Sequence, residues 1–420
     1  MKSYIFCLQL FLPDNNEKLS LIQIPHSNPN PMASTSGKMK LTLLLVSSLT
    51  IMSVITISPA LPQMALAFAD VENAEFLVKM VLTIPALFIA IFSPITGRLI
   101  DKHGRLRILW FSLVLYASSG AGGYFLDNLY FILITRITLG IAVGMSMTIV
   151  ITLIADYFEG MERQKFAGLQ VAFMSLGGIL FIGLGGILAD FSWRFPFLIY
   201  LFSLIVLPLS ILFLHEPVNA NKGKTVNSNV KAPAIIWLLF FNTMTMWIIF
   251  FLIPVQIPFY LKAMGVEKNA LIGAAIASST LFSAISSISY SKLKGRFSFL
   301  TIFSIGYLLM AAGFLTISLS STYVWVLVAM MLSGLGMGMM IPNTNIWEMK
   351  ITPPEIRGKE IGKLTTFWFF GQFVSPIVIY PVLQVLPLSS TFMAGAGLLF
   401  VISSAFIIFQ VSKVGKALSQ

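Results

Sequence analysis

Charged side chains that could do chemistry are concentrated in one short stretch of this chain. Residues 97–109 read GRLIDKHGRLRIL and hold four cationic side chains, one Asp, one His and two Gly, whereas only 10% of the whole chain is charged. Asp101 and Arg105 are four residues apart and could form an ion pair across one helical turn. Gly97 would let a neighbouring backbone come close, and Gly104 would permit the backbone angles of a tight turn. The role of this stretch depends on the elements that position it.

The composition indicates that these elements lie in a lipid bilayer. The chain has 420 residues, of which 57% are hydrophobic, and it contains 36 Phe and 21 Met. A soluble domain of this size could not cover its surface with so few polar groups. A helix that spans the roughly 30 Å hydrocarbon core needs about 20 mostly apolar residues. Twelve segments meet this requirement, at residues 41–68, 76–96, 107–125, 129–157, 166–189, 195–214, 235–261, 269–290, 298–318, 323–347, 358–384 and 389–411.

Twelve helices with short polar connections predict an all-α membrane protein. The longest interruption, residues 215–233, follows the sixth helix. We therefore expect an N-terminal six-helix bundle at residues 40–214, a cytoplasmic linker at 215–233 and a C-terminal six-helix bundle at 234–412. The composition of residues 1–39 is typical of a disordered cytoplasmic tail, and residues 413–420 form a second tail. Met32 or Met39 would be natural starts for the first tail, and the alternative is that its apolar run forms a membrane-surface segment.

The two bundles are predicted to be copies of one six-helix unit. Three short matches recur at nearly the same offset, as in carriers that are built from duplicated units. They are Gly104 and Arg105 with Gly295 and Arg296 at 191 residues, Pro59 and Pro62 with Pro254 and Pro258 at 195 and 196, and Leu139 and Gly140 with Leu335 and Gly336 at 196. The position of Asp101 is occupied by Lys292 in the second copy. The bundles are therefore pseudo-symmetric but chemically different.

The net charge of +11 is distributed as membrane insertion requires. If the first helix starts in the cytoplasm, the outer side of the bundles carries Lys79, Arg194, Lys262 and Lys268, and the cytoplasmic side carries most of the other Lys and Arg residues. This positive-inside pattern places both termini in the cytoplasm of a multi-pass protein in the cytoplasmic membrane. It also argues against a nucleic-acid partner, because phosphate binding would explain clustered charge but not this topology.

The residues that most enzymes and metalloproteins need are missing from the sequence. Cys7 is the single cysteine, and His26, His103 and His215 stand far apart in polar stretches, so we expect no metal site and no cofactor. A phosphate-cradling G-x-x-x-x-G-K-[ST] loop is absent, which argues against an ATP-driven pump. A receptor would normally add a soluble domain, and no segment outside the spans is long enough. We therefore predict that the protein is not an enzyme.

The charged stretch and the helix count together resemble a known family. GRLIDKHGR lies between the second and third spans and resembles the G-x-L-x-D-x-x-G-R loop of the major facilitator superfamily. Twelve spans with a central loop are similar to that family over nearly the whole chain. The stretch FGQFVSPIVIYP at residues 370–381 is most similar to bacterial drug or metabolite exporters of the drug:proton antiporter type. The fifth span resembles the glycine-rich motif of the antiporters in part, with Leu184 where that motif has Pro.

The resemblance implies a role for the charged loop. In the family the loop faces the start of the eleventh helix, which lies here near residues 353–359. Asp156, at the cytoplasmic end of the fourth span, is positioned to be a second partner for Arg105. We therefore expect a latch in which Asp101, Arg105 and Asp156 hold the two halves together when the carrier opens outward, with Gly97 and Gly104 allowing the close approach.

Arg136 is the one charged residue well inside a predicted span. An Arg at a helix centre costs roughly 2.5 to 3.5 kcal/mol, so we expect it to face a wet cavity and contact substrate. The alternative is that it bonds only to backbone carbonyls or extends to the outer surface. Polar and aromatic residues in other spans are further candidates for a central substrate cavity, because an unpaired amide facing lipid is costly. They are Gln63, Gln170, Asn242, Gln256, Asn343, Asn345, Trp368 and Gln372.

These observations predict a secondary active transporter that moves a small organic molecule by alternating access. The resemblance favours proton-coupled efflux of a drug or metabolite by a monomer. The alternative is an uptake permease or facilitator for an anionic or polar nutrient, which Arg136 without a central acid would suit. No Asp or Glu sits in the middle of a span, so the sequence does not name the group that would carry the proton.

Overall fold

The protein is described by a computed structural model over residues 36–217, 230 and 232–411. Most of the first predicted tail, most of the linker and the second tail, together with Cys7 and His26, lie outside the described residues. The helices of the N-terminal half are α1 (Gly37–Ile55), η1 (Ser58–Ala60), α2 (Leu61–Ala67), α3 (Ala74–His103), α4 (Arg105–Phe125), α5 (Leu129–Tyr157), α6 (Gly160–Phe191), η2 (Phe195–Leu201) and α7 (Phe202–Phe213).

The C-terminal half repeats this pattern of long helices. Its elements are α8 (Ile235–Phe250), α9 (Leu252–Ala263), α10 (Asn269–Lys294), α11 (Phe299–Leu319), α12 (Tyr323–Ile351), α13 (Arg357–Leu383) and α14 (Leu388–Val411). The described residues contain twelve helical segments that are long and apolar enough to cross a membrane. The prediction of an all-α protein with twelve spans is therefore confirmed. Several helices are longer than predicted, and α6 starts at Gly160 rather than at residue 166.

The first span of each half is broken near its proline pair. In the N-terminal half, α1 ends at Ile55, and η1 and α2 continue the span. In the C-terminal half, α8 ends at Phe250 and α9 continues the span from Leu252, two residues before Pro254. Proline breaks a helix because it lacks an N–H donor and its ring crowds the preceding turn. The two breaks meet, since the Ser58 hydroxyl donates a hydrogen bond to the Pro254 carbonyl oxygen.

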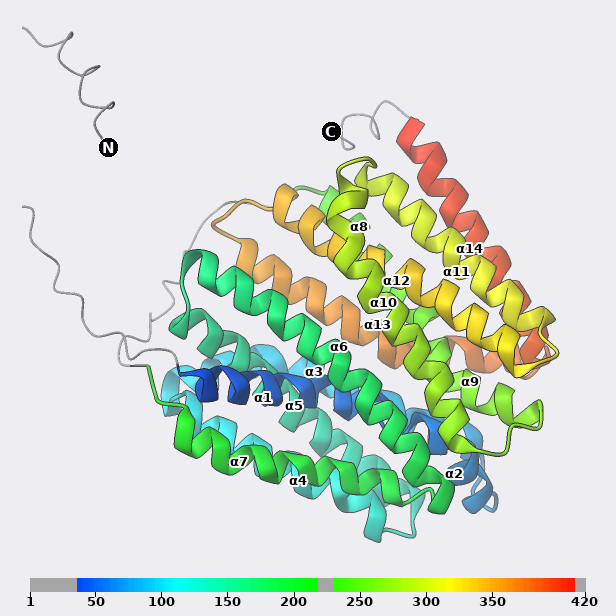
Figure 1. The fold of residues 1–420 in the computed structure, drawn as a ribbon, viewed down its shortest axis with the longest axis horizontal. Helices are drawn as coiled ribbons and strands as arrows, with labels where there is room; N and C mark the ends of the chain where they lie inside the picture. Colours follow the sequence, from blue (N-terminus) through cyan, green and yellow to red (C-terminus); the bar gives the residue numbers. More distant parts are fainter. Residues whose placement is uncertain (1–35, 218–229, 231, 412–420) are drawn as a thin grey trace, which may run out of the picture. The chain divides into compact units, whose positions relative to one another are not determined.

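The helices pack on one another both within each half of the chain and between the halves. Within the N-terminal half α3 packs on α5, α4 on α5 and α1 on α6, and within the C-terminal half α11 packs on α14 and α12, and α10 on α12. The halves contact each other through α6 with α10 and α3 with α13. Figure 1 shows the blue-to-green helices of the first half beside the second half, whose helices run from yellow-green to red.

Contacts between the halves are concentrated at one end of the bundles. We call this end, where α3 begins, the Asn73 end, and the opposite end, where α3 finishes, the Gly97 end. At the Asn73 end, the Asp190 carboxylate accepts hydrogen bonds from the backbone N–H groups of Asn269 and Ala270 at 2.5 and 3.2 Å. The hydrogen bonds that join the halves in the described part of the chain lie at this end. Hydrogen bonds thus join the halves at the Asn73 end.

Glycines allow α6 to approach its neighbours closely. A Cβ on Gly185 would lie 2.1 Å from the Thr56 carbonyl oxygen of the same half. A Cβ on Gly186 would lie 2.7 Å from the Asn269 carbonyl oxygen of the other half. Neither distance leaves room for a side chain. Two of the glycines in the fifth span are therefore required by helix packing near the contact between the halves.

Candidate functional site

The charged loop at the Gly97 end turns sharply at Gly104. Helix α3 ends at His103 and α4 begins at Arg105, so Gly104 alone connects them. Its φ of 83° and ψ of 167° lie in a region that is essentially restricted to glycine. The helix break separates Asp101 and Arg105 into different helices. The turn expected at Gly104 is present, but the two residues do not form the ion pair that their spacing suggests.

Arg105 pairs instead with Asp156 at the end of α5. Its Nε lies 2.6 Å from the Asp156 Oδ2, and the two side chains are 9% and 10% exposed. Asp101 is exposed and takes part in none of the ion pairs among the described residues. A Cβ on Gly97 would meet nothing within 4 Å, and the same holds for Gly358 at the start of α13. There is therefore open space beside both glycines in this conformation, and neither is in close contact with the other half.

Glu216 completes the network around Arg105 and is missed by the sequence analysis. Its carboxylate accepts hydrogen bonds from the backbone N–H groups of Arg105 at 2.7 Å and Leu106 at 2.9 Å. The first N–H groups of a helix have no partner within the helix, and Gly104 has no side chain that could accept them. An acid just after the sixth span was the available signal, but Glu216 falls in the stretch assigned to the linker.

Arg136 is fully buried inside the N-terminal half. Its Nη2 donates to the carbonyl oxygens of Ser119 at 3.0 Å and Gly120 at 2.7 Å in α4. Its guanidinium carbon lies 4.9 Å from the centre of the Phe197 ring and 5.2 Å from that of Tyr200. Its Nε lies 3.4 Å from the Thr135 hydroxyl, and its Nη1 is buried without a hydrogen-bond partner. Backbone carbonyls are thus among its partners, as in the alternative, but they do not occupy all of its donors. In this conformation Arg136 joins α5 to α4 and η2.

The neutral candidates for a substrate cavity fall into two groups. Several make hydrogen bonds within one half or lie at the surface: Gln170 donates to Ser47, the Asn242 side-chain oxygen accepts from Tyr307, Asn343 accepts from Tyr290 and donates to the Phe299 carbonyl oxygen, and Asn345 is exposed. The Nδ2 of Asn242, both side-chain polar atoms of Gln256 and the Oε1 of Gln372 are buried without a hydrogen-bond partner. These polar atoms are therefore candidates for binding a ligand or water.

An aromatic pair lies next to Gln372. The rings of Trp247 in α8 and Trp368 in α13 are stacked, with centroids 4.4 Å apart. The Trp247 Nε1 is buried without a hydrogen-bond partner. Gly371 lets α13 approach α8, since a Cβ there would lie 2.6 Å from the Met244 carbonyl oxygen. The α8 and α13 contact thus combines flat aromatic surface with free polar atoms.

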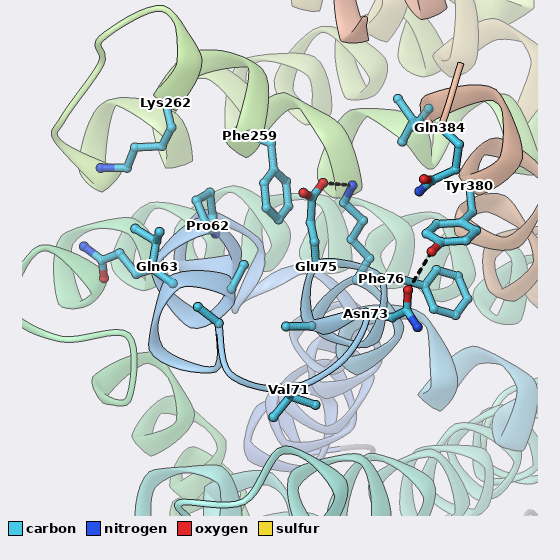
Figure 2. A pocket seen from close by; sticks show the side chains of 16 residues that line it. Pro62, Gln63, Val71, Asn73, Glu75, Phe76, Phe259, Lys262, Tyr380 and Gln384 are labelled. Atoms are coloured by element: carbon cyan, nitrogen blue, oxygen red, sulfur yellow. Dashed lines mark hydrogen bonds and ion pairs between the residues drawn. The ribbon is translucent and has the colours of Figure 1, made fainter. Parts of the chain in front are cut away.

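A cavity of about 860 Å³ lies at the Asn73 end and is lined by both halves. Gln63, Asn73 and Glu75 come from α2, α3 and the turn between them, and Phe259 and Tyr380 come from α9 and α13. Figure 2 shows Tyr380 pointing at Asn73, whose side-chain oxygen accepts its hydroxyl at 2.8 Å. Of the predicted cavity residues, Gln63 therefore lies at this end, away from the aromatic pair.

A buried cation borders this cavity. The Lys79 side chain is 5% exposed, and its Nζ lies 2.5 Å from the Glu75 carboxylate one turn earlier. It also lies 4.6 Å from the centre of the Phe259 ring in the other half. Desolvated contacts between a cation and an aromatic ring are worth about 2 kcal/mol. Lys79 thus contributes to the contact that closes the Asn73 end.

Known proteins with this pattern belong to one family. The family model described as Major Facilitator Superfamily matches residues 43–376. The chain belongs to the Major Facilitator Superfamily. Its members are transporters rather than enzymes. Among solved structures, the fold is similar to a D-xylose-proton symporter with a TM-score of 0.73 and 17% identity, over 89% of this chain and 97% of that one. It is also similar to the nucleoside transporter NupG, with a TM-score of 0.70 and 14% identity, over 88% of this chain and 99% of that one.

Curated members of the superfamily with higher identity match only parts of the chain. The Tetracycline resistance protein, class H, of Pasteurella multocida is 30% identical over 215 residues, which are 48% of this chain and 54% of that protein. The Quinolone resistance protein NorA of Staphylococcus aureus is 32% identical over 133 residues, which are 31% of this chain and 34% of that protein. The chain thus spans about half of the first relative and a third of the second.

Proposed function

We propose that this superfamily member exports a small organic molecule by alternating access, with protons as the coupling ion. The observation that carries the proposal is the asymmetry between the two ends. Hydrogen bonds join the halves at the Asn73 end, whereas none of the hydrogen bonds and ion pairs between described residues joins them at the Gly97 end. In the orientation given by the positive-inside rule, with both termini in the cytoplasm, the Gly97 end faces the cytoplasm, and we infer that the path opens on that side.

We propose that the substrate binds near the Trp247 and Trp368 pair. Stacked rings offer a flat apolar surface, and the free atoms of Trp247, Gln372 and Gln256 offer hydrogen bonds in a mostly apolar site. A planar polycyclic molecule with a few polar groups would fit this chemistry. The two relatives named for tetracycline and quinolone resistance support the same class of substrate. Trp368 and Gln372 are thus retained as substrate residues, and Arg136 is assigned a supporting role.

The latch remains part of this proposal. When the halves tilt and the Gly97 end closes, Asp101 would approach the start of α13, where unpaired backbone N–H groups favour a carboxylate. The Arg105 and Asp156 pair already holds the loop in position. At the same time the Asn73 end would open and the Asp190 contacts with Asn269 and Ala270 would break.

Transport in proteoliposomes with an imposed pH gradient tests this function. Purified protein is reconstituted, and movement of tetracycline and the quinolone norfloxacin is followed in vesicles of both orientations. We expect accumulation driven by the pH gradient in the direction of export, and its loss in Trp368→Ala. Trp237→Ala, which removes an exposed tryptophan of α8, is the matched control and should transport normally.

The second candidate is uptake of a polar nutrient. Two structural neighbours are titled as a D-xylose-proton symporter and a nucleoside transporter, and both share the fold over most of their length. The same vesicles loaded with xylose or a nucleoside distinguish the candidates. Accumulation of these solutes with the proton gradient, without movement of tetracycline or norfloxacin, would replace export by uptake.

A further inference from the structure

Glu348 is a buried acid without a cationic partner. It lies in the last turn of α12 and is completely buried. Its Oε1 accepts a hydrogen bond from the Thr352 hydroxyl at 3.0 Å, and its Oε2 is buried with no hydrogen-bond partner. None of the ion pairs among the described residues includes it. A carboxylate that is buried without a cation is so costly that it normally takes up a proton.

An acid at the same end of the N-terminal half is in a different state. Asp156 ends the fourth span, and Glu348 lies 192 residues later, one helical turn before the position that the 196-residue offset of Leu139 and Gly140 pairs with Asp156. Asp156 pairs with Arg105 at 2.6 Å. The repeat partner of Arg105 is Arg296, which is exposed and forms none of the described ion pairs. The C-terminal half therefore also has an acid near the end of its fourth span and an arginine after its second span, but in this conformation the two form no ion pair.

The other charged groups near Glu348 are engaged elsewhere or lie outside ion-pair distance. The Nη2 of Arg357, at the start of α13, donates to the carbonyl oxygens of Met349 at 3.0 Å and Thr352 at 3.4 Å, while its Nε is buried without a hydrogen-bond partner. Lys363 binds both carboxylate oxygens of Glu360 at 2.8 and 3.0 Å. The remaining charged residues at this end of the elements that pack on α12, and of α12 itself, are Lys292, Lys294, Arg296, Lys350 and Lys359. None of these cations pairs with Glu348 among the described residues.

We propose that Glu348 is the proton-binding site of the C-terminal half. The carboxylate takes one proton from water and becomes a neutral carboxylic acid while it is buried without Arg296. It releases that proton when a rearrangement of the half brings Arg296 to it, in the arrangement that Arg105 and Asp156 already have. Proton binding thus favours the separated conformation, and deprotonation favours the paired one. This assignment rests on the proposed proton-coupled transport for its role in coupling, but the protonation of Glu348 stands apart from it.

Infrared difference spectroscopy tests the protonation without a substrate. Wild-type protein in lipid is compared with Glu348→Gln near neutral pH, in the region where the C=O stretch of a protonated carboxylic acid absorbs. We expect one such band in the wild type and its loss in Glu348→Gln. Glu360→Gln is the matched control, because Glu360 is also buried at this end but is paired with Lys363, and it should keep the band. If the wild type has no band that Glu348→Gln removes, the proposal is wrong.

A second variant controls for misfolding. The Glu348→Gln protein should fold, because Gln has nearly the shape of protonated Glu. The Glu348→Asp protein keeps a carboxyl group at this position, so we expect its band to shift rather than disappear. An unchanged band in Glu348→Asp would assign the signal to another residue and overturn the proposal.

Transport then tests coupling. In proteoliposomes, Glu348→Gln should still exchange labelled for unlabelled tetracycline or norfloxacin, but it should lose accumulation driven by a pH gradient. The exchange rate should also lose its dependence on pH. Full gradient-driven accumulation in Glu348→Gln would overturn the coupling role. If the wild type moves neither compound, the proposed function fails for these substrates, whereas the infrared band still decides the protonation of Glu348.

Discussion

The two halves carry related charged residues at the Gly97 end but use them differently. In the N-terminal half the buried Arg105 side chain pairs with Asp156, and the Glu216 carboxylate accepts hydrogen bonds from backbone N–H groups at the start of α4. In the C-terminal half Arg296 is exposed, and Glu348 is buried with a threonine as its hydrogen-bond partner. The arginine and the acid are therefore paired in the N-terminal half, whereas in the C-terminal half Arg296 and Glu348 form no ion pair.

The difference begins at a single glycine in each half. Gly104 has a φ of 83°, which ends α3 abruptly and starts α4 at the next residue. Gly295, its repeat partner, has a φ of −65° and caps α10 in an ordinary helical conformation, four residues before α11. The sharp turn directs Arg105 towards Asp156, whereas the longer connection leaves Arg296 in solvent. The two repeat-related connections thus differ, with a tight turn at Gly104 and a longer connection after Gly295.

Neutralising the acid should have opposite effects in the two halves, and this is the largest effect that we expect. Asp156→Asn leaves the buried Arg105 without its counter-ion, and breaking a buried pair in this way costs about 3 kcal/mol. Glu348→Gln removes a buried charge without a cationic partner, so it should leave stability unchanged or raised. Thermal unfolding in detergent, followed by tryptophan fluorescence, compares the two variants. Asp101→Asn, at an exposed position, is the control, and equal melting temperatures for all three variants would contradict the comparison.

The sequence was sufficient for the fold because the bilayer imposes a simple rule. A span must be long and apolar, and the twelve predicted spans are all present as helices. The sequence analysis used the proline pairs as a sign of the repeat, and they also lie near the break in the first span of each half, since proline disrupts a helix through its own backbone. Both features depend on local composition, which a sequence displays directly.

The candidate site could be predicted only in part, because partners come from distant residues. Glu216 binds α4 from 111 residues away, and no local pattern connects them. For Arg136, the sequence showed that a buried charge needs a polar environment but not which residues would supply it. The structure directs it to the carbonyl oxygens of Ser119 and Gly120. Packing between helices likewise determines which side-chain atoms of Gln256 and Gln372 are buried without a hydrogen-bond partner, and the sequence does not show it.

Replacing Gly104 or Gly295 with alanine should have opposite effects on stability. Gly104→Ala forces a side chain into a backbone conformation that costs about 2 kcal/mol, and the new Cβ would lie 3.3 Å from the Glu216 Oε1. Gly295→Ala keeps its helical angles, and its Cβ would meet nothing closer than 3.6 Å. It should therefore stabilise the protein by about 0.5 kcal/mol, because the unfolded chain loses freedom. Similar melting temperatures for the two variants would contradict the requirement for glycine in the turn at position 104.

Removing the charge of Glu216 gives the smallest effect and tests the network most locally. Glu216→Gln keeps one acceptor oxygen at the start of α4 but loses the negative charge that the helix N-terminus favours, so we expect a loss of about 1 kcal/mol. The control is Glu355→Gln, an exposed acid before α13 that binds no backbone N–H group among the described residues. Hydrogen exchange measured by mass spectrometry should become faster in the peptide that contains Arg105 and Leu106 in the first variant alone. Because both amides bind this carboxylate, unchanged exchange there would mean that α4 is held by its packing and not by Glu216.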